Sequence, residues 1–371
     1  MSAFKIKAKD TNCNARTGQL TTAHGVIETP VFMPVGTRGT VKGLLPDTIK
    51  ETGAQIILAN TYHMVIRPGV DVVEKLGGLH KFMAWDRPIL TDSGGYQVFS
   101  LESINRIGAD GVEFASHIDG KRVYLDPKIA TEVQNRLGAD IIMCFDECTP
   151  FPCEPKKLKD AVERTIRWAG ICKDSHKREG QLLFGIVQGG IDLDLRAYCA
   201  EKLIEIDFPG YAIGGLSVGE GHENMVKTVS FTAPLLPEDK PRYLMGVGMP
   251  EDIIAAVYAG VDMFDCVLPT RNGRNGTAFV ESGYLKMRNS SHIDDDSPVD
   301  RSCNCYCCRN FTRAAIRHFF NVGEMLGPIL LSIHNIRYFQ RLTATIRAKI
   351  TENTFADWAK QMLAQKKQVS E

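Results

Sequence analysis

The sequence lacks the apolar run of about 18 to 20 residues that a membrane-spanning helix needs. Its first ten residues, MSAFKIKAKD, are charged and lack the apolar core of a secretory signal. We therefore expect a cytoplasmic protein with no membrane partner. In that compartment the 11 cysteines are expected to be free thiols or metal ligands rather than disulfides.

The chain also lacks net charge, because 44 Lys and Arg side chains balance 44 Asp and Glu side chains. Taken over the whole chain, this balance argues against a general nucleic-acid binder. The distribution is uneven, since residues 271–347 hold 11 basic and 6 acidic side chains. This local excess is a candidate patch for a polyanion, but a solvated surface of mixed sign gives the same count.

No Gly-rich phosphate fingerprint follows the first predicted strand, which weakens a doubly wound open sheet as the fold. The sequence instead has a series of short apolar runs, each ending in glycine or a polar residue. Such runs are typical of parallel strands that are buried on both faces. The eight runs are Val31–Val35, Gln55–Asn60, Pro88–Asp92, Asp140–Asp146, Leu182–Gln188, Tyr211–Gly215, Arg242–Gly246 and Val261–Asp265.

Helical periodicity fills most of the gaps between these runs. The predicted helices are Pro127–Leu137, Lys156–Lys177, Asp194–Ile206, Glu223–Leu236 and Pro250–Ala259. Eight strands with intervening helices over about 250 residues match the size of a TIM barrel. We therefore predict an α/β fold, a (β/α)8 barrel, in a single domain that covers residues 1–371.

Two additions interrupt the barrel pattern. Residues 111–126 alternate on both sides of Asp119-Gly120, which predicts a β-hairpin inserted after the third barrel strand. After the eighth strand come a Gly-rich turn, an acidic loop at Asp294–Asp296 and the stretch CNCYCCRN at 303–310. Its four cysteines predict a small zinc-binding subdomain at about residues 277–340.

Polar side chains end four of the predicted strands: Asp92, Asp146, Gln188 and Asp265. In a barrel, the carboxyl ends of the strands form the active site. One Asp after a strand is usually a helix cap or a turn former, but three on one rim are harder to explain in that way. A pair of carboxylates can cleave a glycosidic bond, one acting at the sugar carbon and one moving a proton. A carboxylate can also accept two N–H donors from a purine edge.

Several motifs recur in order over nearly the whole chain. They are Thr91–Gln97 (TDSGGYQ), Phe145–Pro150 (FDECTP), Gly185–Gly190 (GIVQGG), Gly214–Gly219 (GGLSVG), Asp262–Gly276 (DMFDCVLPTRNGRNG), and Cys303, Cys305 and Cys308 with His334. Together they resemble the tRNA-guanine transglycosylase (queuine tRNA-ribosyltransferase) family, bacterial type. The resemblance implies replacement of guanine by the 7-deazaguanine preQ1 at the wobble position of GUN-anticodon tRNAs, a step of queuosine modification.

The resemblance also implies roles for individual residues. Asp265 would be the nucleophile at ribose C1′, forming a covalent intermediate, and Asp92 the general acid/base. The substrate-binding residues would be Asp92, Ser93, Tyr96, Asp146, Gln188, Gly215, Leu216 and Met245. Among these, Tyr96 and Met245 would sandwich the base, although ordinary packing would also explain them. Arg271 and Arg274 would contact RNA near the anticodon.

Two pocket residues bear on the size of the incoming base. In the family, the pocket that admits queuine, with its bulky cyclopentenediol, has Gly where this chain has Val218 and Val where it has Cys148. Val218 and Cys148 match the bacterial pattern and leave less room, which favours preQ1. Ser217 departs from the Ala that is common in bacterial members, and because serine is small we expect little effect.

Four thiols in six residues cannot easily all bind one zinc ion. Adjacent Cys307 and Cys308 point in different directions, whereas the C-x-C-x2-C spacing selects Cys303, Cys305 and Cys308. A fourth ligand must come from another segment, and the cysteine spacing does not decide which histidine it is.

The histidine candidates for the fourth ligand are His292, His318 and His334, and the resemblance implies His334. Four protein ligands close the coordination shell, so one structural Zn²⁺ per subunit is expected. The family resemblance further implies a homodimer with the zinc subdomain at its interface.

Two other functional classes stay open. The first is a catalytically silent RNA-binding partner subunit of the same family, against which the presence of both Asp92 and Asp265 argues. The second is a zinc-dependent barrel hydrolase, which would need an open coordination position and a histidine-rich strand rim, whereas the predicted rim carries carboxylates and no such histidine cluster.

Overall fold

The computed structural model describes residues 3–95, 105–115 and 120–369. Tyr96, predicted to lie against the base, and Asp119, predicted at the hairpin turn, fall outside these ranges. None of the helices within the described ranges is long and apolar enough to cross a lipid bilayer.

Eight parallel strands close into a barrel. In chain order they are β4 (Val31–Gly36), β5 (Ile57–Asn60), β6 (Ile89–Asp92), β10 (Ile141–Met143), β11 (Leu182–Val187), β12 (Gly210–Ile213), β13 (Arg242–Leu244) and β14 (Met263–Cys266). Strand β14 pairs with β4, which completes the ring. Each strand overlaps one predicted apolar run, so the (β/α)8 prediction is confirmed and the open sheet is excluded.

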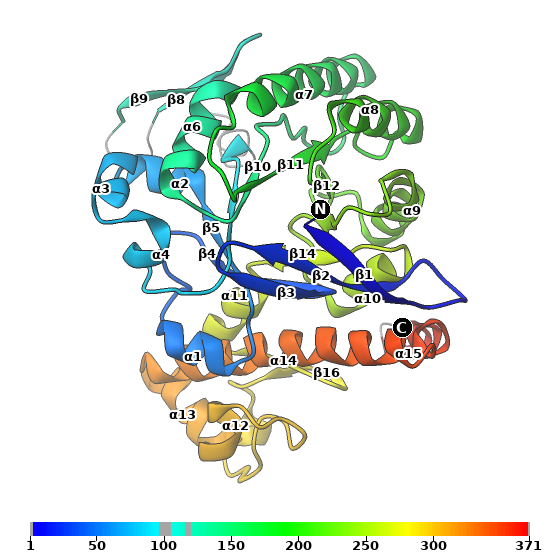
Figure 1. Cartoon of the computed structure of the whole chain (residues 1–371). Helices are drawn as coiled ribbons and strands as arrows, with labels where there is room; N and C mark the ends of the chain where they lie inside the picture. Colours follow the sequence, from blue (N-terminus) through cyan, green and yellow to red (C-terminus); the bar gives the residue numbers. More distant parts are fainter. Residues whose placement is uncertain (1–2, 96–104, 116–119, 370–371) are drawn as a thin grey trace.

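Helices cover the outside of the barrel (Figure 1). The five predicted ones are α6 (Pro127–Leu137), α7 (Pro155–Ser175), α8 (Leu193–Ile206), α9 (His222–Thr232) and α10 (Pro250–Tyr258). Helix α6 begins where the Asp126 side chain accepts a hydrogen bond from the Ile129 N–H, and it ends at Gly138 in the left-handed conformation. Four short helices lie near the second and third strands: α1 (Pro46–Glu51), α2 (Thr61–Ile66), α3 (Val70–Lys75) and α4 (Gly78–Phe82).

An antiparallel sheet of three strands closes the amino-terminal end of the barrel. Its strands are β1 (Phe4–Lys9), β2 (Arg16–Thr22) and β3 (Gly25–Thr29). Phe4, Leu20 and Ile27 from this sheet are buried in one cluster with residues of the barrel strands, among them Met33 and Ile186. Figure 1 shows the sheet lying across the barrel. The sheet therefore forms a floor that closes this end of the barrel.

The predicted insertion follows β6. Strands β8 (Val112–Ala115) and β9 (Arg122–Leu125) pair antiparallel, with Val112 opposite Leu125. This confirms the hairpin, and β7 (Asn105–Ile107) adds a third strand that the alternation did not predict.

The region after β14 departs from the prediction at one point. The predicted Gly-rich turn is wrong at its start, because residues there form helix α11 (Leu268–Arg274). The remaining elements are β15 (Thr277–Val280), β16 (Gly283–Lys286), a 3-10 turn (Ser290–His292), α12 (Tyr306–Asn310), α13 (Arg313–Val322), α14 (Leu326–Thr351) and α15 (Phe355–Val369). Helix α14 separates α12 and α13 from the barrel (Figure 1). It packs closely on α11, since a Cβ at Gly273 would lie 2.8 Å from the Ser332 nitrogen.

Candidate active site

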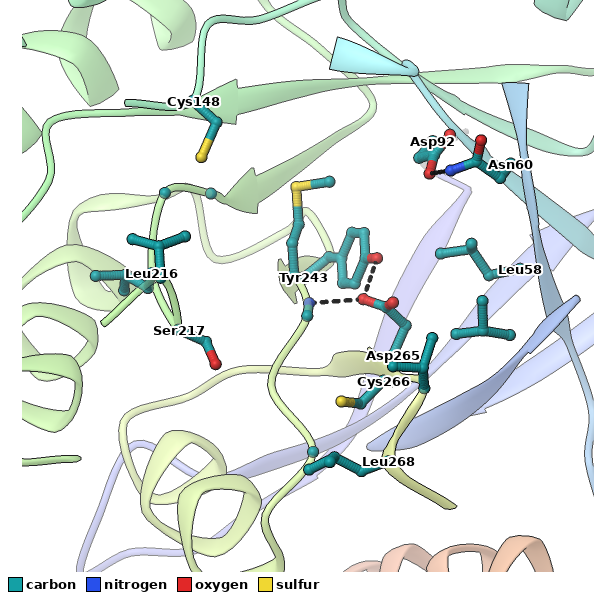
Figure 2. A pocket seen from close by; sticks show the side chains of 18 of the residues that line it. Leu58, Asn60, Asp92, Cys148, Leu216, Ser217, Tyr243, Asp265, Cys266 and Leu268 are labelled. Carbon is teal, nitrogen blue, oxygen red and sulfur yellow. Dashed lines mark hydrogen bonds between the residues drawn. The ribbon is translucent and has the colours of Figure 1, made fainter. Parts of the chain in front are cut away.

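A cavity of about 550 Å³ opens at the carboxyl ends of the barrel strands, opposite the floor sheet. Its lining contains most of the residues that the sequence nominated: Asp92, Ser93, Asp146, Gln188, Gly215, Leu216, Met245, Asp265 and Arg271. Figure 2 shows Asp92 and Asp265 on one side of this cavity, with Cys148, Leu216 and Ser217 on the other. These nominated residues come from six of the eight strands or the loops that follow them, and Val35 of β4 and Asn60 of β5 line the cavity as well.

Asp265 lies on β14 and is held by two hydrogen bonds to the same carboxylate oxygen. Its Oδ1 accepts from the Tyr243 hydroxyl at 2.6 Å and from the Gly246 N–H at 2.8 Å (Figure 2). Gly246 has a positive φ of 73°, which a side chain would disfavour. Burial raises the pKa of Asp265 above its ordinary value, and the bonds from Tyr243 and Gly246 oppose that shift. The two bonds fix the carboxylate and leave Oδ2 out of both.

Asp92 ends β6, where the chain of the neighbouring strand β5 enters helix α2. Its Oδ1 accepts from the Thr61 N–H at 3.0 Å, and its Oδ2 accepts from the Asn60 side chain. Burial raises the pKa of Asp92 to about 7, with a further upward contribution from the charge of Asp265. Near neutral pH this group therefore exists in both protonation states, as a general acid/base must.

Asp146 lies on the loop after β10. The strand ends at Met143, three residues before the end of the predicted run. The Ser93 hydroxyl donates to Oδ1 at 3.1 Å, and the Gln188 Nε2 donates to Oδ2 at 2.7 Å. Burial raises the pKa of Asp146 to about 6. The arrangement is a polar edge whose carboxylate is held by two side-chain hydrogen bonds.

Gly215 faces this polar edge from the end of β12. It has a positive φ of 65°, and a Cβ at this position would lie 2.2 Å from the Gln188 Oε1. Only glycine therefore fits while Gln188 keeps its position, and the backbone of Gly215 and Leu216 is left facing the cavity.

Tyr243 and Asn60 are functional candidates that the sequence reading missed. Each of them donates a hydrogen bond to one of the two central carboxylates. A signal was available in both cases. Tyr243 lies two residues before Met245 and so on the same face of its strand, and Asn60 is the polar end of the second apolar run.

The two predicted RNA-contacting arginines lie on α11, directly after β14. Arg271 is exposed and lines the cavity. Arg274 is half-buried, and its Nη1 has no hydrogen-bond partner among the described residues. Arg274 does not line the cavity within that part of the chain.

The predicted metal ligands converge between α12 and α14. The sulfur atoms of Cys303, Cys305 and Cys308 and a nitrogen of His334 all lie within 4.8 Å of one another. The His334 Nδ1 lies 3.2 Å from the Cys308 sulfur, while its Nε2 donates to the Phe279 carbonyl at 2.8 Å. That bond places the proton on Nε2 and leaves the Nδ1 lone pair for a metal ion. The set fits a four-coordinate ion.

The other candidates for the metal site lie elsewhere. His292 pairs with Asp295 at 3.1 Å, and His318 is exposed on α13. Cys307 is buried next to the cluster and stays outside its four-ligand set. The prediction of three cysteines with His334 is therefore confirmed as a cluster that could hold a metal ion.

A closed parallel barrel with carboxylates at the carboxyl ends of its strands is the architecture of a (β/α)8 barrel enzyme. Residues 10–368 match the family model described as queuine tRNA-ribosyltransferase. The chain belongs to the queuine tRNA-ribosyltransferase family, as its motifs predicted.

Relatives from several bacteria cover almost the full length. The queuine tRNA-ribosyltransferase of Desulforamulus reducens is 54% identical over 360 residues, which is 97% of this chain and 97% of the relative. The one of Thermoanaerobacter pseudethanolicus is 55% identical over 359 residues, 96% of each chain. The one of Acinetobacter baylyi is 53% identical over 360 residues, 96% of this chain and 93% of the relative.

Proposed function

We propose that this chain is a tRNA-guanine(34) preQ1 transglycosylase, a pentosyltransferase that replaces the wobble guanine of GUN-anticodon tRNAs by preQ1. The observation that carries the proposal is the pair of buried carboxylates, Asp92 and Asp265, which face one cavity from different strands. The two carboxylates have different surroundings, which suit them to different roles. Asp265 is oriented by two donors, and Asp92 has a pKa near neutrality.

In the proposed reaction, Asp265 forms a bond to ribose C1′ as the bond from C1′ to guanine breaks. The electron pair of that bond stays on the base, and protonated Asp92 supplies the proton that the leaving guanine needs. The incoming preQ1 then gives a proton to ionised Asp92 and bonds to C1′ while the Asp265 ester bond breaks. Tyr243 and Gly246 hold Oδ1, so that Oδ2 is the oxygen that faces the sugar.

Asp146, Gln188 and Ser93 are proposed to read the base edge, together with backbone groups of Gly215 and Leu216. The Asp146 carboxylate lies in a buried polar cluster, and it can accept parallel N–H donors from a guanine-like edge. Met245 and Tyr96 are proposed to sandwich the ring, Met245 from the lining of the cavity. A wobble base lies in a loop, where extrusion costs less than from a duplex.

Arg271 and Arg274 are proposed to bind the RNA backbone beside the cavity. Arg271 lies at its lining, and Arg274 has a buried guanidinium nitrogen without a partner in the described part of the chain. Both belong to the segment with the local excess of positive charge. Phosphate contacts of this kind make binding sensitive to salt.

We propose that Cys303, Cys305, Cys308 and His334 hold one structural Zn²⁺. Three sulfurs and one nitrogen suit zinc, and four protein ligands leave no position for a reacting water molecule. Residues at about 277–340 would then be a zinc-binding subdomain of a single-domain chain, and this subdomain is the proposed interface of a homodimer.

The wild-type protein is expected to incorporate radiolabelled guanine into a tRNA with a GUN anticodon. It should also incorporate preQ1 but not queuine, because Val218 and Cys148 occupy part of the cavity wall that a cyclopentenediol would need. Both reactions are measured as the radioactivity that filter-bound tRNA gains from the labelled base.

A tRNA with another base at the wobble position is the control and should stay unlabelled. Binding of tRNA without any exchange would instead support the silent partner subunit. Equal use of queuine and preQ1 would refute the argument from Val218 and Cys148, and Val218→Gly is the variant expected to admit the larger base.

The rate of base exchange should peak near pH 7, because departure of guanine needs protonated Asp92 and arrival of preQ1 needs its ionised form. Asp92→Asn can do neither step, so we expect a loss of about 10²–10⁴-fold. Initial rates between pH 5 and pH 9 test both points, and an Asn variant with wild-type rates would exclude Asp92 as the acid/base.

The stability of Asp92→Asn shows whether a loss of activity comes from unfolding. The folded pKa of Asp92 is raised from 3.8 to about 7, so ionisation lowers the stability of the wild type as the pH rises through that interval. Asp92→Asn should therefore raise the free energy of unfolding at pH 8 by roughly 4 kcal/mol, and by less at pH 5. Denaturant melts at the two pH values measure the difference.

A further inference from the structure

Two histidines and an aspartate meet at the floor of the barrel, opposite the cavity. Asp140 directly precedes β10, His24 lies in the turn between β2 and β3, and His80 lies on α4. None of the three has a part in the proposed exchange reaction. Segments that are far apart in the sequence therefore converge on one carboxylate.

The Asp140 carboxylate is fully buried and is oriented by the backbone. The His24 N–H donates to Oδ1 at 3.0 Å, and the Ile89 N–H donates to Oδ2 at 2.9 Å. A carboxylate oxygen has about two lone-pair sites, so one site on each oxygen remains. The two imidazoles face these sites, with His24 Nδ1 2.8 Å from Oδ1 and His80 Nε2 3.0 Å from Oδ2.

The two imidazole rings are stacked, with centroids 3.5 Å apart and planes 16° from parallel. One ligand atom from each of the three residues lies within 4.8 Å of the others. A first-row divalent ion at about 2.0–2.2 Å from each donor needs donor atoms roughly 3–3.5 Å apart. The rings must also separate from the carboxylate and turn out of their parallel stack, because a metal ion lies in the plane of each imidazole that binds it. The His24 side chain is 39% exposed, so an ion can reach the cluster from solvent.

We propose that His24, His80 and Asp140 form a second metal site, which binds Zn²⁺ or a neighbouring ion such as Co²⁺ exchangeably. Two imidazoles and a carboxylate are suitable ligands for such ions, and three protein ligands leave a position for water. On binding, each imidazole moves its proton to the other ring nitrogen, so that the facing nitrogen gives its lone pair. The ion then fastens the β2–β3 turn and α4 to the barrel floor, which couples metal binding to stability.

The test is a titration with Co²⁺ of the protein whose cysteine cluster is already filled with zinc. We expect one Co²⁺ per chain in calorimetry, with visible d–d absorption and no thiolate-to-cobalt charge-transfer band, which separates this site from the cysteine cluster. His24→Gln and His80→Gln should each weaken Co²⁺ binding by more than about tenfold. His222→Gln is the matched control, because His222 pairs with one carboxylate, Asp252, outside any three-ligand cluster in the described residues. It should bind Co²⁺ as the wild type does.

Absence of Co²⁺ binding in the wild type, or unchanged binding in both Gln variants, would overturn the proposal. The three residues would then only join their segments by hydrogen bonds. Should either variant fail to fold, proton NMR of the wild type decides. Bound Co²⁺ must then shift the ring resonances of His24 and His80, and shifts confined to other histidines count against the site.

Discussion

Asp265→Asn should reduce guanine exchange into tRNA by at least about 10⁴-fold, the scale on which removal of a nucleophile acts. An amide oxygen cannot form the covalent ribosyl intermediate. It can still accept the hydrogen bonds that Tyr243 and Gly246 donate to Oδ1, so the local geometry should survive. Initial rates with radiolabelled guanine measure the loss.

Tyr243→Phe is the matched comparison, since it removes one of the two donors and keeps the carboxylate. One hydrogen bond to a charged group contributes about 1.5–3 kcal/mol, so this variant should lose roughly 10- to 150-fold. Denaturing gels of tRNA mixed with each protein give an independent readout: a covalent complex should form with Tyr243→Phe and be absent with Asp265→Asn. Exchange by Asp265→Asn within tenfold of the wild type would remove Asp265 from the nucleophile role.

Cys308→Ala should abolish tight zinc binding at the cysteine cluster and destabilise the region around α12 and α14. Structural zinc contributes about 10–16 kcal/mol of apparent binding free energy, of which the intact barrel should retain part. We therefore expect a thermal midpoint lower by more than about 10 °C, together with less than one zinc ion per chain. Metal analysis and calorimetry measure the two quantities.

Cys307→Ala is the control for this prediction. It removes a neighbouring buried thiol that lies outside the four-ligand set, so its zinc content should stay at one per chain. A strong chelator should lower the midpoint of the wild type towards that of Cys308→Ala and should change Cys308→Ala little. Full zinc content in Cys308→Ala would contradict the assigned ligand set.

The barrel could be predicted from sequence because strands buried on both faces are continuous apolar runs, as in Ile141–Met143 and Leu182–Val187. The polar rim followed from the same runs, since Asp92, Gln188 and Asp265 stand where they end. The cysteine spacing likewise limited the choice of metal ligands among the four cysteines, and the family motifs indicated His334.

Other features depend on contacts that no local pattern carries. The stretch RNGRNG at residues 271–276 has the composition of a turn, yet residues Leu268–Arg274 are helical where they pack on α14. The floor sheet is specified by burial of Phe4 and Leu20 against the barrel interior, and the pairing of His24 with Asp140 spans 116 residues. The spacing of Tyr243 from Met245 places Tyr243 on the face towards the cavity, but its hydrogen bond to Asp265 follows only from the structure.

The floor sheet has a consequence for the order of events. Within the described residues, Phe4, Leu20 and Ile27 close the barrel from below, so in the proposed reaction a base enters and leaves at the end where the RNA would bind. In the proposed reaction, guanine therefore has to depart past the tethered tRNA before the second base can take its place. Because both bases use the same opening, the proposed reaction follows a ping-pong sequence, in which the two bases compete for the same form of the enzyme.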